Sequence, residues 1–157
     1  LIEDLVSIKN VPLFVKLPPW PRNDENRREL LKLAATAVDA GVDGLVVANT
    51  HPVESRLLQV GRGGLSGAPL FEHTELMIAD IQAQVQGDVA IVACGGVSTA
   101  EHVWRLLAIG ASAVELYTAF IYEGPGLPAR INKRLSKLMK AAGISSIGEI
   151  YGDPPQL

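Results

Sequence analysis

The amino-acid sequence predicts an α/β fold in which a strand and a helix alternate four times. Three observations carry this prediction. Four short apolar runs rich in β-branched residues are spaced along the chain, amphipathic helical patterns follow them, and glycines stand just after two of the predicted helices. Alternation of this kind favours parallel strands joined by right-handed helical crossovers.

The predicted strands are short and almost entirely apolar, as expected of strands that are buried on both faces. We place them at Leu13–Leu17, Gly44–Asn49, Val89–Gly96 and Ala113–Ala119. Each of these runs is too short to form an average helix, and this favours the strand interpretation.

Two helices are predicted in the first half of the sequence. In Glu25–Ala40 the apolar residues recur every three or four positions, which gives one buried stripe, and Gly41 follows as the C-terminal cap. The segment Thr74–Val85 has the same periodicity. Each of these helices therefore connects two consecutive strands of the predicted sheet.

Two more helices are predicted toward the C-terminus. Ser98 and Glu101 have the spacing of a capping box, which predicts a helix that begins there and runs to about Ile109, with Gly110 ending it. The last predicted helix covers Leu127–Ala142.

A faint internal repeat suggests a larger architecture. "AGVDGLVV" at Ala40–Val47 and "IGASAVEL" at Ile109–Leu116 share a helix end, a capping glycine, a polar turn residue and a strand. Repeated βα units form either an eight-stranded barrel or an open doubly wound sheet. Four strands are half of such a barrel and cannot close, so the open edges require either a missing first half-barrel or a second chain.

Composition narrows the class of protein. The 157 residues, 48% of them hydrophobic, fit one compact domain covering 1–157. With 14 Lys and Arg against 17 Asp and Glu and no basic run, nucleic acid is not expected as a partner.

Cys94 is the only cysteine, so no internal disulfide forms. The sequence has no signal-peptide pattern, no apolar run of ~18 residues and no metal-ligand spacing, so we expect a cytoplasmic protein without a metal.

Lys16 is the first candidate for a ligand contact, because ligands of parallel βα folds bind where strands end. It stands between Val15 and Leu17, where an unpaired ammonium is costly. Three interpretations remain open. The side chain extends to water along the apolar surface, it faces a bound anion or electron-rich ring, or it is a Schiff-base nucleophile as in an aldolase.

Asn49 and Thr50 are the second candidates. They end an otherwise apolar strand, and an amide beside a hydroxyl suits a planar polar ligand. The alternative is a turn in which this pair bonds its own backbone. His51 follows, but the sequence shows no partner that would orient it as a general base. His73 and His102 are interpreted as ordinary helix residues.

Two glycine-rich loops are candidates for phosphate binding. "RGGLSGAPL" at Arg62–Leu70 joins the second strand to the next helix and lacks the Lys-Ser/Thr pair of nucleotide-phosphate loops. "CGGVS" at Cys94–Ser98 runs from a strand into a helix and presents backbone N–H groups at a positive helix end. The next strand ends in "LYTAF", and barrels commonly bind phosphate after their last two strands. Cys94 itself is interpreted as a small buried core residue.

Six segments together resemble a known family. They are "VPLFVKLPP", "DGLVVANT", "GGLSGAPL", "VACGGVSTAEH", "GASAVELYTAFIYEGP" and "GISSIGEIYG", which occur in family order between Val11 and Gly152. In these segments the chain resembles the C-terminal half of dihydroorotate dehydrogenase, the flavin enzyme of pyrimidine synthesis. "LSGAPL" and "LYTAFIYEGP" are more similar to the quinone-linked class 2 enzymes than to the soluble class 1 enzymes.

The resemblance implies a TIM (β/α)8 barrel of which this chain supplies about four C-terminal βα units. It implies FMN as the cofactor, oxidation of dihydroorotate to orotate, and a quinone as the electron acceptor. The implied cofactor-binding residues are Lys16, Ala48, Gly67, Gly96, Tyr117 and Thr118. Asn49 and Thr50 would bind the substrate. Lys16 would lie beside the flavin ring, where a cation stabilises negative charge gained on reduction.

The chain also departs from the family pattern. Family members commonly have a second threonine where His51 stands, so a related FMN barrel acting on another pyrimidine is an alternative. The resemblance places the catalytic base, a serine in class 2 and a cysteine in class 1, in the absent first half, and Cys94 lies on the wrong strand to replace it. No catalytic residue is therefore expected in this chain.

Membrane association would depend on an absent N-terminal segment. A further alternative is an inactive half-barrel that dimerises or acts as a scaffold.

Overall fold

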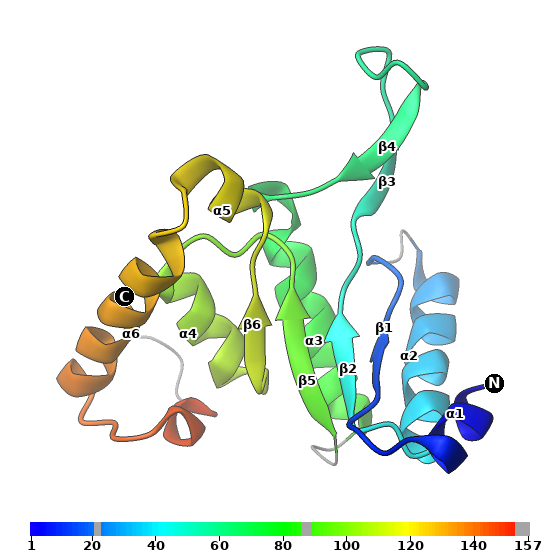
Figure 1. Cartoon of the computed structure of the whole chain (residues 1–157), viewed down its shortest axis with the longest axis horizontal. Coiled ribbons are helices and arrows are strands. Elements are labelled where there is room, and N and C mark those ends of the chain that lie inside the picture. Colours follow the sequence, from blue (N-terminus) through cyan, green and yellow to red (C-terminus); the bar gives the residue numbers. More distant parts are fainter. Residues whose placement is uncertain (21–22, 86–88, 153–157) are drawn as a thin grey trace.

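The structure, a computed structural model, describes residues 1–20, 23–85 and 89–152. Its centre is a four-stranded parallel sheet in the order β1-β2-β5-β6 (Figure 1). The strands are β1 (Phe14–Lys16), β2 (Gly44–Val47), β5 (Ala90–Cys94) and β6 (Ala113–Glu115). All four predicted strands are present, and their parallel arrangement is confirmed.

Helices cover one face of this sheet and leave the other face open (Figure 1). The covering helices are α2 (Asp24–Asp39), α3 (Phe71–Val85) and α4 (Ala100–Ala108), and α6 (Leu127–Ala141) packs beside α4. The smaller elements are α1 (Ile2–Ile8), α5 (Thr118–Glu123) and two 3-10 turns, η1 (Ala68–Leu70) and η2 (Ile147–Ile150). Among the described residues, no helix is long and apolar enough to cross a membrane.

The two faces of the sheet differ in burial because successive strand residues point to opposite sides. On the helix side the central residues are fully buried: Leu45, Val47, Ile91 and Ala93. The other side carries two rows of paired residues: Phe14, Gly44 and Ala90 form one, and Lys16, Val46 and Val92 form the next. Phe14 remains 42% exposed there, and no described element covers it. The open apolar face expected of half a barrel is therefore present.

The start of α4 differs from the prediction by one residue. Thr99, rather than Ser98, is the N-cap, and its hydroxyl accepts a hydrogen bond from the His102 amide at 3.1 Å. The predicted capping box is wrong because Glu101 bonds Arg134 of α6 at 2.9 Å, while Ser98 faces the ring of His102. Ser98 and Thr99 both have a hydroxyl that can cap a helix, and the contact between Glu101 and α6 determines that Thr99 is the N-cap.

The last predicted strand is shorter than its apolar run. We predicted Ala113–Ala119, but β6 ends at Glu115 and α5 begins at Thr118. The reason is that "TAFIYE" forms a short helix, which ends at Gly124 with a positive φ of 78°. The predicted strand thus contains a strand, a turn and the first helical residues, and the turn faces the carboxyl edge of the sheet.

The glycine-rich segment Arg62–Leu70, predicted to be a loop, begins with a strand. Arg62–Leu65 is β4, which pairs antiparallel with β3 (His51–Glu54) in a hairpin that projects from the carboxyl edge of the sheet (Figure 1). Gly63 and Gly64 lower the local strand propensity, so the sequence pattern did not indicate this pairing.

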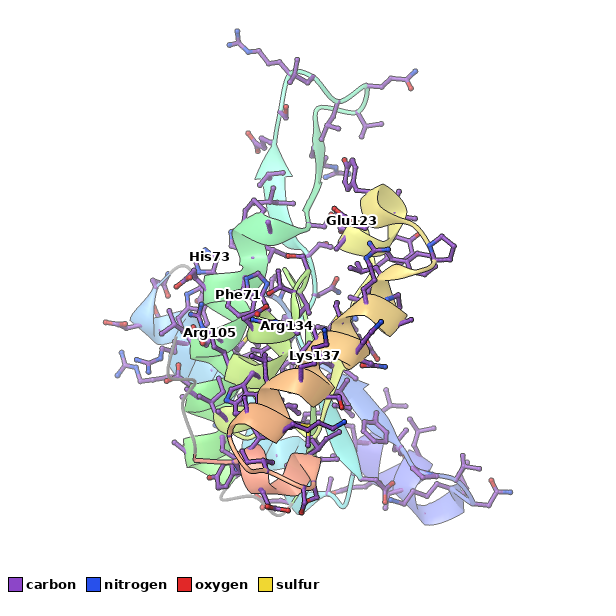
Figure 2. All side chains as sticks on the ribbon, turned by 90° about the vertical axis from the view of Figure 1, so that its left-hand side faces the viewer. Phe71, His73, Arg105, Glu123, Arg134 and Lys137 are labelled. Atoms are coloured by element: carbon purple, nitrogen blue, oxygen red, sulfur yellow. The ribbon has the colours of Figure 1, made fainter. Side chains whose placement is uncertain are left out.

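Neighbouring helices are joined by arginine–carboxylate pairs. The pairs are Arg27–Asp80 between α2 and α3, Arg105–Glu75 between α3 and α4, and Arg134–Glu101 between α4 and α6. Arg105 is the most connected of these arginines, because its guanidinium also lies 4.7 Å from the centre of the Phe71 ring and 3.7 Å from Glu72 (Figure 2). It therefore ties the start of α3 to α4 through two kinds of contact.

Replacing Arg105 by alanine should lower the free energy of unfolding by about 1–3 kcal/mol, since a two-pronged carboxylate pair and a ring contact are lost together. Urea denaturation followed by circular dichroism measures this. Arg130→Ala is the matched control, because Arg130 pairs with Glu123 where both side chains are more than half exposed. That control should change stability by about 0.5 kcal/mol or less. Equal losses in the two variants would contradict a special role for Arg105.

Candidate functional site

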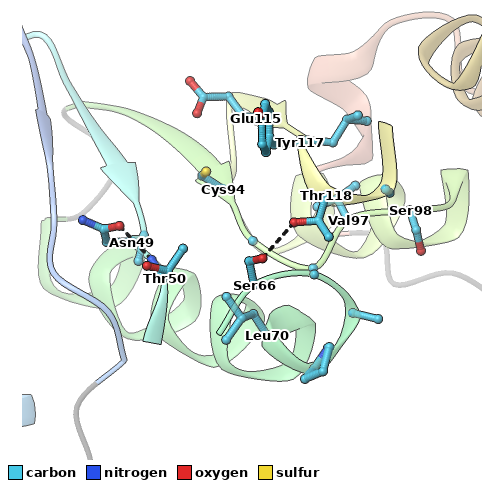
Figure 3. A pocket seen from close by; sticks show the side chains of 18 of the residues that line it. Asn49, Thr50, Ser66, Leu70, Cys94, Val97, Ser98, Glu115, Tyr117 and Thr118 are labelled. Carbon is cyan, nitrogen blue, oxygen red and sulfur yellow. Dashed lines mark hydrogen bonds between the residues drawn. The ribbon is translucent and has the colours of Figure 1, made fainter. Parts of the chain in front are cut away.

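The carboxyl ends of the four parallel strands line one pocket of about 640 Å³, which we call the strand-end pocket (Figure 3). All eight residues predicted from the sequence to bind cofactor or substrate line it: Lys16, Ala48, Asn49, Thr50, Gly67, Gly96, Tyr117 and Thr118. They come from all four strand ends and from the segment before α3. The structure therefore brings the predicted set together, and the binding role of each residue stays a prediction.

The end of β2 presents a backbone carbonyl and a side-chain amide. The Val47–Ala48 peptide bond is cis, and the Ala48 amide donates to the carbonyl of Cys94 at 2.9 Å. Ala48 therefore has only its carbonyl left for a ligand. The Asn49 side-chain oxygen accepts from the Thr50 amide at 2.8 Å, as in the turn weighed as the alternative. This hydrogen bond fixes the amide plane and leaves the NH2 group of Asn49 as a donor.

Two glycine turns come close to helix starts at the other side of the pocket. Gly96 follows β5 with a positive φ of 74°, and a β-carbon placed on it would lie 2.3 Å from the backbone nitrogen of Phe71. No residue other than glycine fits that approach. Within the described chain, the Gly96 amide donates to no protein acceptor. It is therefore available to a ligand in front of α4.

Gly67 and Thr118 join the second glycine-rich loop to the start of α5. A β-carbon on Gly67 would lie 2.9 Å from the methyl carbon of Thr118, and the Thr118 hydroxyl donates to the Ser66 hydroxyl at 3.1 Å (Figure 3). Thr118 begins α5, so its amide has no partner within the helix. Amide and hydroxyl donors of two loops thus converge at this edge of the pocket.

Lys16 and Cys94 contact each other on the open face of the sheet. The Lys16 ammonium donates to the Cys94 sulfur at 3.4 Å. The expectation that Cys94 is a buried core residue is wrong, because it is only half-buried and lines the pocket. Burial still raises the pKa of the Cys94 thiol, and Lys16 opposes this rise by stabilising the thiolate. The thiol form therefore dominates at neutral pH.

The histidines lie outside the strand-end pocket. His51 lines a small neighbouring cavity, where its ring centre is 6.4 Å from that of His73, and the Trp20 ring centre lies 6.3 Å from that of His73. His102 stacks on Phe71 with ring centres 3.8 Å apart, and burial, followed by the charge of Arg105, lowers its pKa. The cavity that His51 lines shares Ala48, Asn49 and Leu70 with the strand-end pocket, so His51 stands beside that pocket rather than in its wall.

Sequence reasoning missed several residues that line the pocket. They are Ser66, Ser98, Glu115, Tyr122 and Glu123. Ser66 stands inside the quoted glycine-rich loop, and Glu115 immediately precedes the quoted "LYTAF". For Ser66, Ser98 and Glu115 the available signal was a position within two residues of a predicted site residue, whereas Tyr122 and Glu123 enter the pocket because α5 folds back over it. Glu115 is the most informative of them, because it puts a carboxylate opposite Lys16 on the same face of the sheet.

With this geometry in place, comparisons with known proteins identify the family. The family model described as dihydroorotate dehydrogenase matches residues 1–139. The chain belongs to this family. The structural relatives are TIM barrels of which this chain covers only a part, so its four βα units are a portion of such a barrel.

Individual relatives agree with this assignment. Dihydroorotate dehydrogenase (quinone) of Cereibacter sphaeroides is 37% identical over 97% of this chain, and the mitochondrial quinone enzyme of Oryza sativa is 35% identical over 90%. The chain spans 44% and 30% of their lengths. The Eimeria tenella dihydroorotate dehydrogenase structure with ferulenol superposes with a TM-score of 0.75 at 36% identity, covering 89% of this chain and 37% of that one.

Replacing Gly96 by alanine should remove about 3 kcal/mol or more of stability, because the new β-carbon meets rigid backbone and the positive φ is strained as well. Thermal unfolding measures this. The matched control is Gly143→Ala at the end of α6, where φ is 72° but nothing lies within 4 Å, so only a backbone cost of about 1 kcal/mol is expected. A Gly96 variant no worse than this control would contradict the close approach between the turn and α3.

Proposed function

We propose that this chain forms the C-terminal half of an FMN-dependent dihydroorotate dehydrogenase that passes electrons to a quinone. One observation carries the proposal: Lys16, Asn49, Gly96 and Thr118 come from four different strand ends and line one pocket. Ligands of parallel βα folds bind at this edge. The relatives are dihydroorotate dehydrogenases (quinone), which supports the reaction and the acceptor.

The donors around the pocket fit FMN. A flavin phosphate needs several N–H and O–H donors and no metal, and the Gly96 amide, the Thr118 amide and the hydroxyls of Ser66 and Ser98 are such donors at one side of the pocket. The volume of about 640 Å³ lies in the range of small-molecule sites. When bound, FMN would supply a ring that accepts a hydride from the substrate.

The remaining predicted residues would position the ring and the pyrimidine. Lys16 lies one strand away from Asn49, so an ammonium and an amide face the same space from neighbouring strand ends. The ammonium would stabilise negative charge on the reduced ring. The side-chain oxygen of Asn49 accepts from the Thr50 amide, and this orients the Asn49 NH2 group. The NH2 group would donate to a carbonyl or carboxylate oxygen of dihydroorotate. Ala48 would contact the ring through its carbonyl.

We further propose that the base which removes the substrate proton, and the strands which cover Phe14 and the open face, come from a first half-barrel outside this sequence. The alternatives remain an enzyme for another pyrimidine and a half-barrel that pairs with its own copy. His51, in the cavity that shares Asn49 with the strand-end pocket, is the residue on which the choice between pyrimidines depends. The assembled barrel is therefore the form in which activity is expected.

FMN should bind to the assembled barrel and give a yellow protein whose flavin absorbance persists through gel filtration. Lys16→Met should weaken FMN binding by about tenfold, since one charged contact to the ring is lost. Fluorescence titration with FMN measures the dissociation constant. Lys137→Met, on the exposed side of α6, is the control and should bind FMN as the original chain does. A colourless protein that takes up no FMN would refute the cofactor assignment.

Dihydroorotate oxidation should require both halves of the barrel. We expect the 157-residue chain alone to be inactive, and the same chain joined to the first half of the Cereibacter sphaeroides relative to reduce a soluble quinone. Orotate absorbance and quinone bleaching measure the two sides of the reaction, with dihydrouracil as the competing substrate.

Turnover by the chain alone would show that the base lies within it. Preference for dihydrouracil would favour the other pyrimidine enzyme. Sedimentation tests the scaffold alternative: the joined protein should be a closed monomeric barrel, whereas a stable, inactive dimer of the chain that remains unable to bind FMN would support self-pairing.

A further inference from the structure

Three polar side chains meet on the open face of the sheet: Lys16 of β1, Cys94 of β5 and Glu115 of β6. The register places them on one side, because Lys16 pairs with Val46, Val46 with Val92, and Cys94 directly with Glu115. The Cys94 sulfur points to the side of the sheet on which the Glu115 carboxyl lies (Figure 3). An ammonium, a thiol and a carboxylate are thus neighbours on the floor of the strand-end pocket.

The thiol lies between the two charges in strand order and is next to both. The Lys16 ammonium donates to its sulfur at 3.4 Å, and Glu115 is the direct cross-strand neighbour of Cys94. A thiol can accept one hydrogen bond and donate another, whereas an alanine or valine at this position does neither. Burial raises the pKa of Cys94, Lys16 lowers it, and Glu115 raises it. Cys94 therefore keeps its proton beside both charges.

Resting on the FMN-binding role proposed above, we propose that Cys94 and Glu115 are positioning residues for Lys16 that set the relative affinity of the pocket for reduced and oxidised flavin. Cys94 holds the ammonium at the pocket floor. Glu115 puts a negative charge behind it and so weakens the positive field that a bound ring meets. The two side chains act on the bound ring through Lys16.

The proposal predicts opposite effects from the two positions. Without the Cys94 thiol the ammonium loses its acceptor, and reduced flavin loses part of its stabilisation. Without the Glu115 charge the field of Lys16 is stronger, and reduced flavin gains stabilisation. A purely structural role at either position would weaken binding of both flavin forms in the same direction, so the sign of the effect discriminates between the two explanations.

The cluster itself is tested first without flavin, through the alkylation of Cys94, the only cysteine of this chain. The barrel is assembled with a first half that carries no cysteine, and the rate with iodoacetamide is followed against pH by mass spectrometry. Lys16→Met should move the midpoint to higher pH and Glu115→Gln to lower pH, each changing the rate at pH 8 about threefold. Glu54→Gln, in the projecting hairpin, is the charge-matched control and should leave the profile unchanged. Coincident profiles for all four proteins would overturn the cluster.

The flavin part is tested by measuring the reduction potential of FMN bound to the assembled barrel. Cys94→Ala should lower, and Glu115→Gln should raise, the ratio of affinities for reduced and oxidised FMN about threefold, a shift of about 14 mV for a two-electron couple. Cys94→Ser should restore most of the original potential, since a hydroxyl also accepts and donates.

Shifts of the same sign in the Cys94→Ala and Glu115→Gln variants, or unchanged potentials, would overturn the proposal. Failure of the unsubstituted barrel to bind FMN would instead refute the proposed function. The alkylation profiles separate the two failures, because they report the Lys16–Cys94–Glu115 contacts in the absence of flavin.

Discussion

The parallel register of the four strands is the constraint on which the rest of the molecule depends. Because β1, β2, β5 and β6 run in one direction, their carboxyl ends meet at one edge. Residues as distant in the chain as Lys16 and Thr118 therefore line the same pocket. The helices maintain this register by burying Leu45 and Ile91 completely on the opposite face, so the packing of one face positions the polar groups at the edge.

Those parts of the fold that depend on local pattern were predictable from the sequence. Each strand of the parallel sheet lies in a short apolar run, and in β2 a polar residue marks where the chain leaves the core, as Asn49 does after Val47. The site followed from the same logic, since strand ends in a parallel sheet share one edge. The boundary at Ser98 and Thr99 was not predictable, because two adjacent hydroxyls give the same capping signal and the pairing of Glu101 with α6 lies outside the local sequence.

Other features depend on contacts that no local pattern carries. The β3–β4 hairpin forms because His51–Glu54 and Arg62–Leu65 meet across a turn, although two glycines in β4 weaken its strand signal. Cys94 stands in a continuous apolar run, and such a run does not tell which residues face the helices. Only the register shows that Cys94 shares the open face with Val92, while Ala93 is buried on the other. The same alternation revealed Glu115.

One face of the sheet is apolar and the other carries charged side chains, and this difference bears on how a complete barrel would close. The helix face is apolar and needs no charge compensation. The open face carries an ammonium and a carboxylate with a thiol between them. Enclosing that face in a barrel would remove water from both charges, and burying either one alone would be far more costly than burying the two together. A carboxylate on the same face as Lys16, with Cys94 contacting the ammonium, is thus an arrangement that makes a cation at the pocket floor compatible with a dry barrel interior.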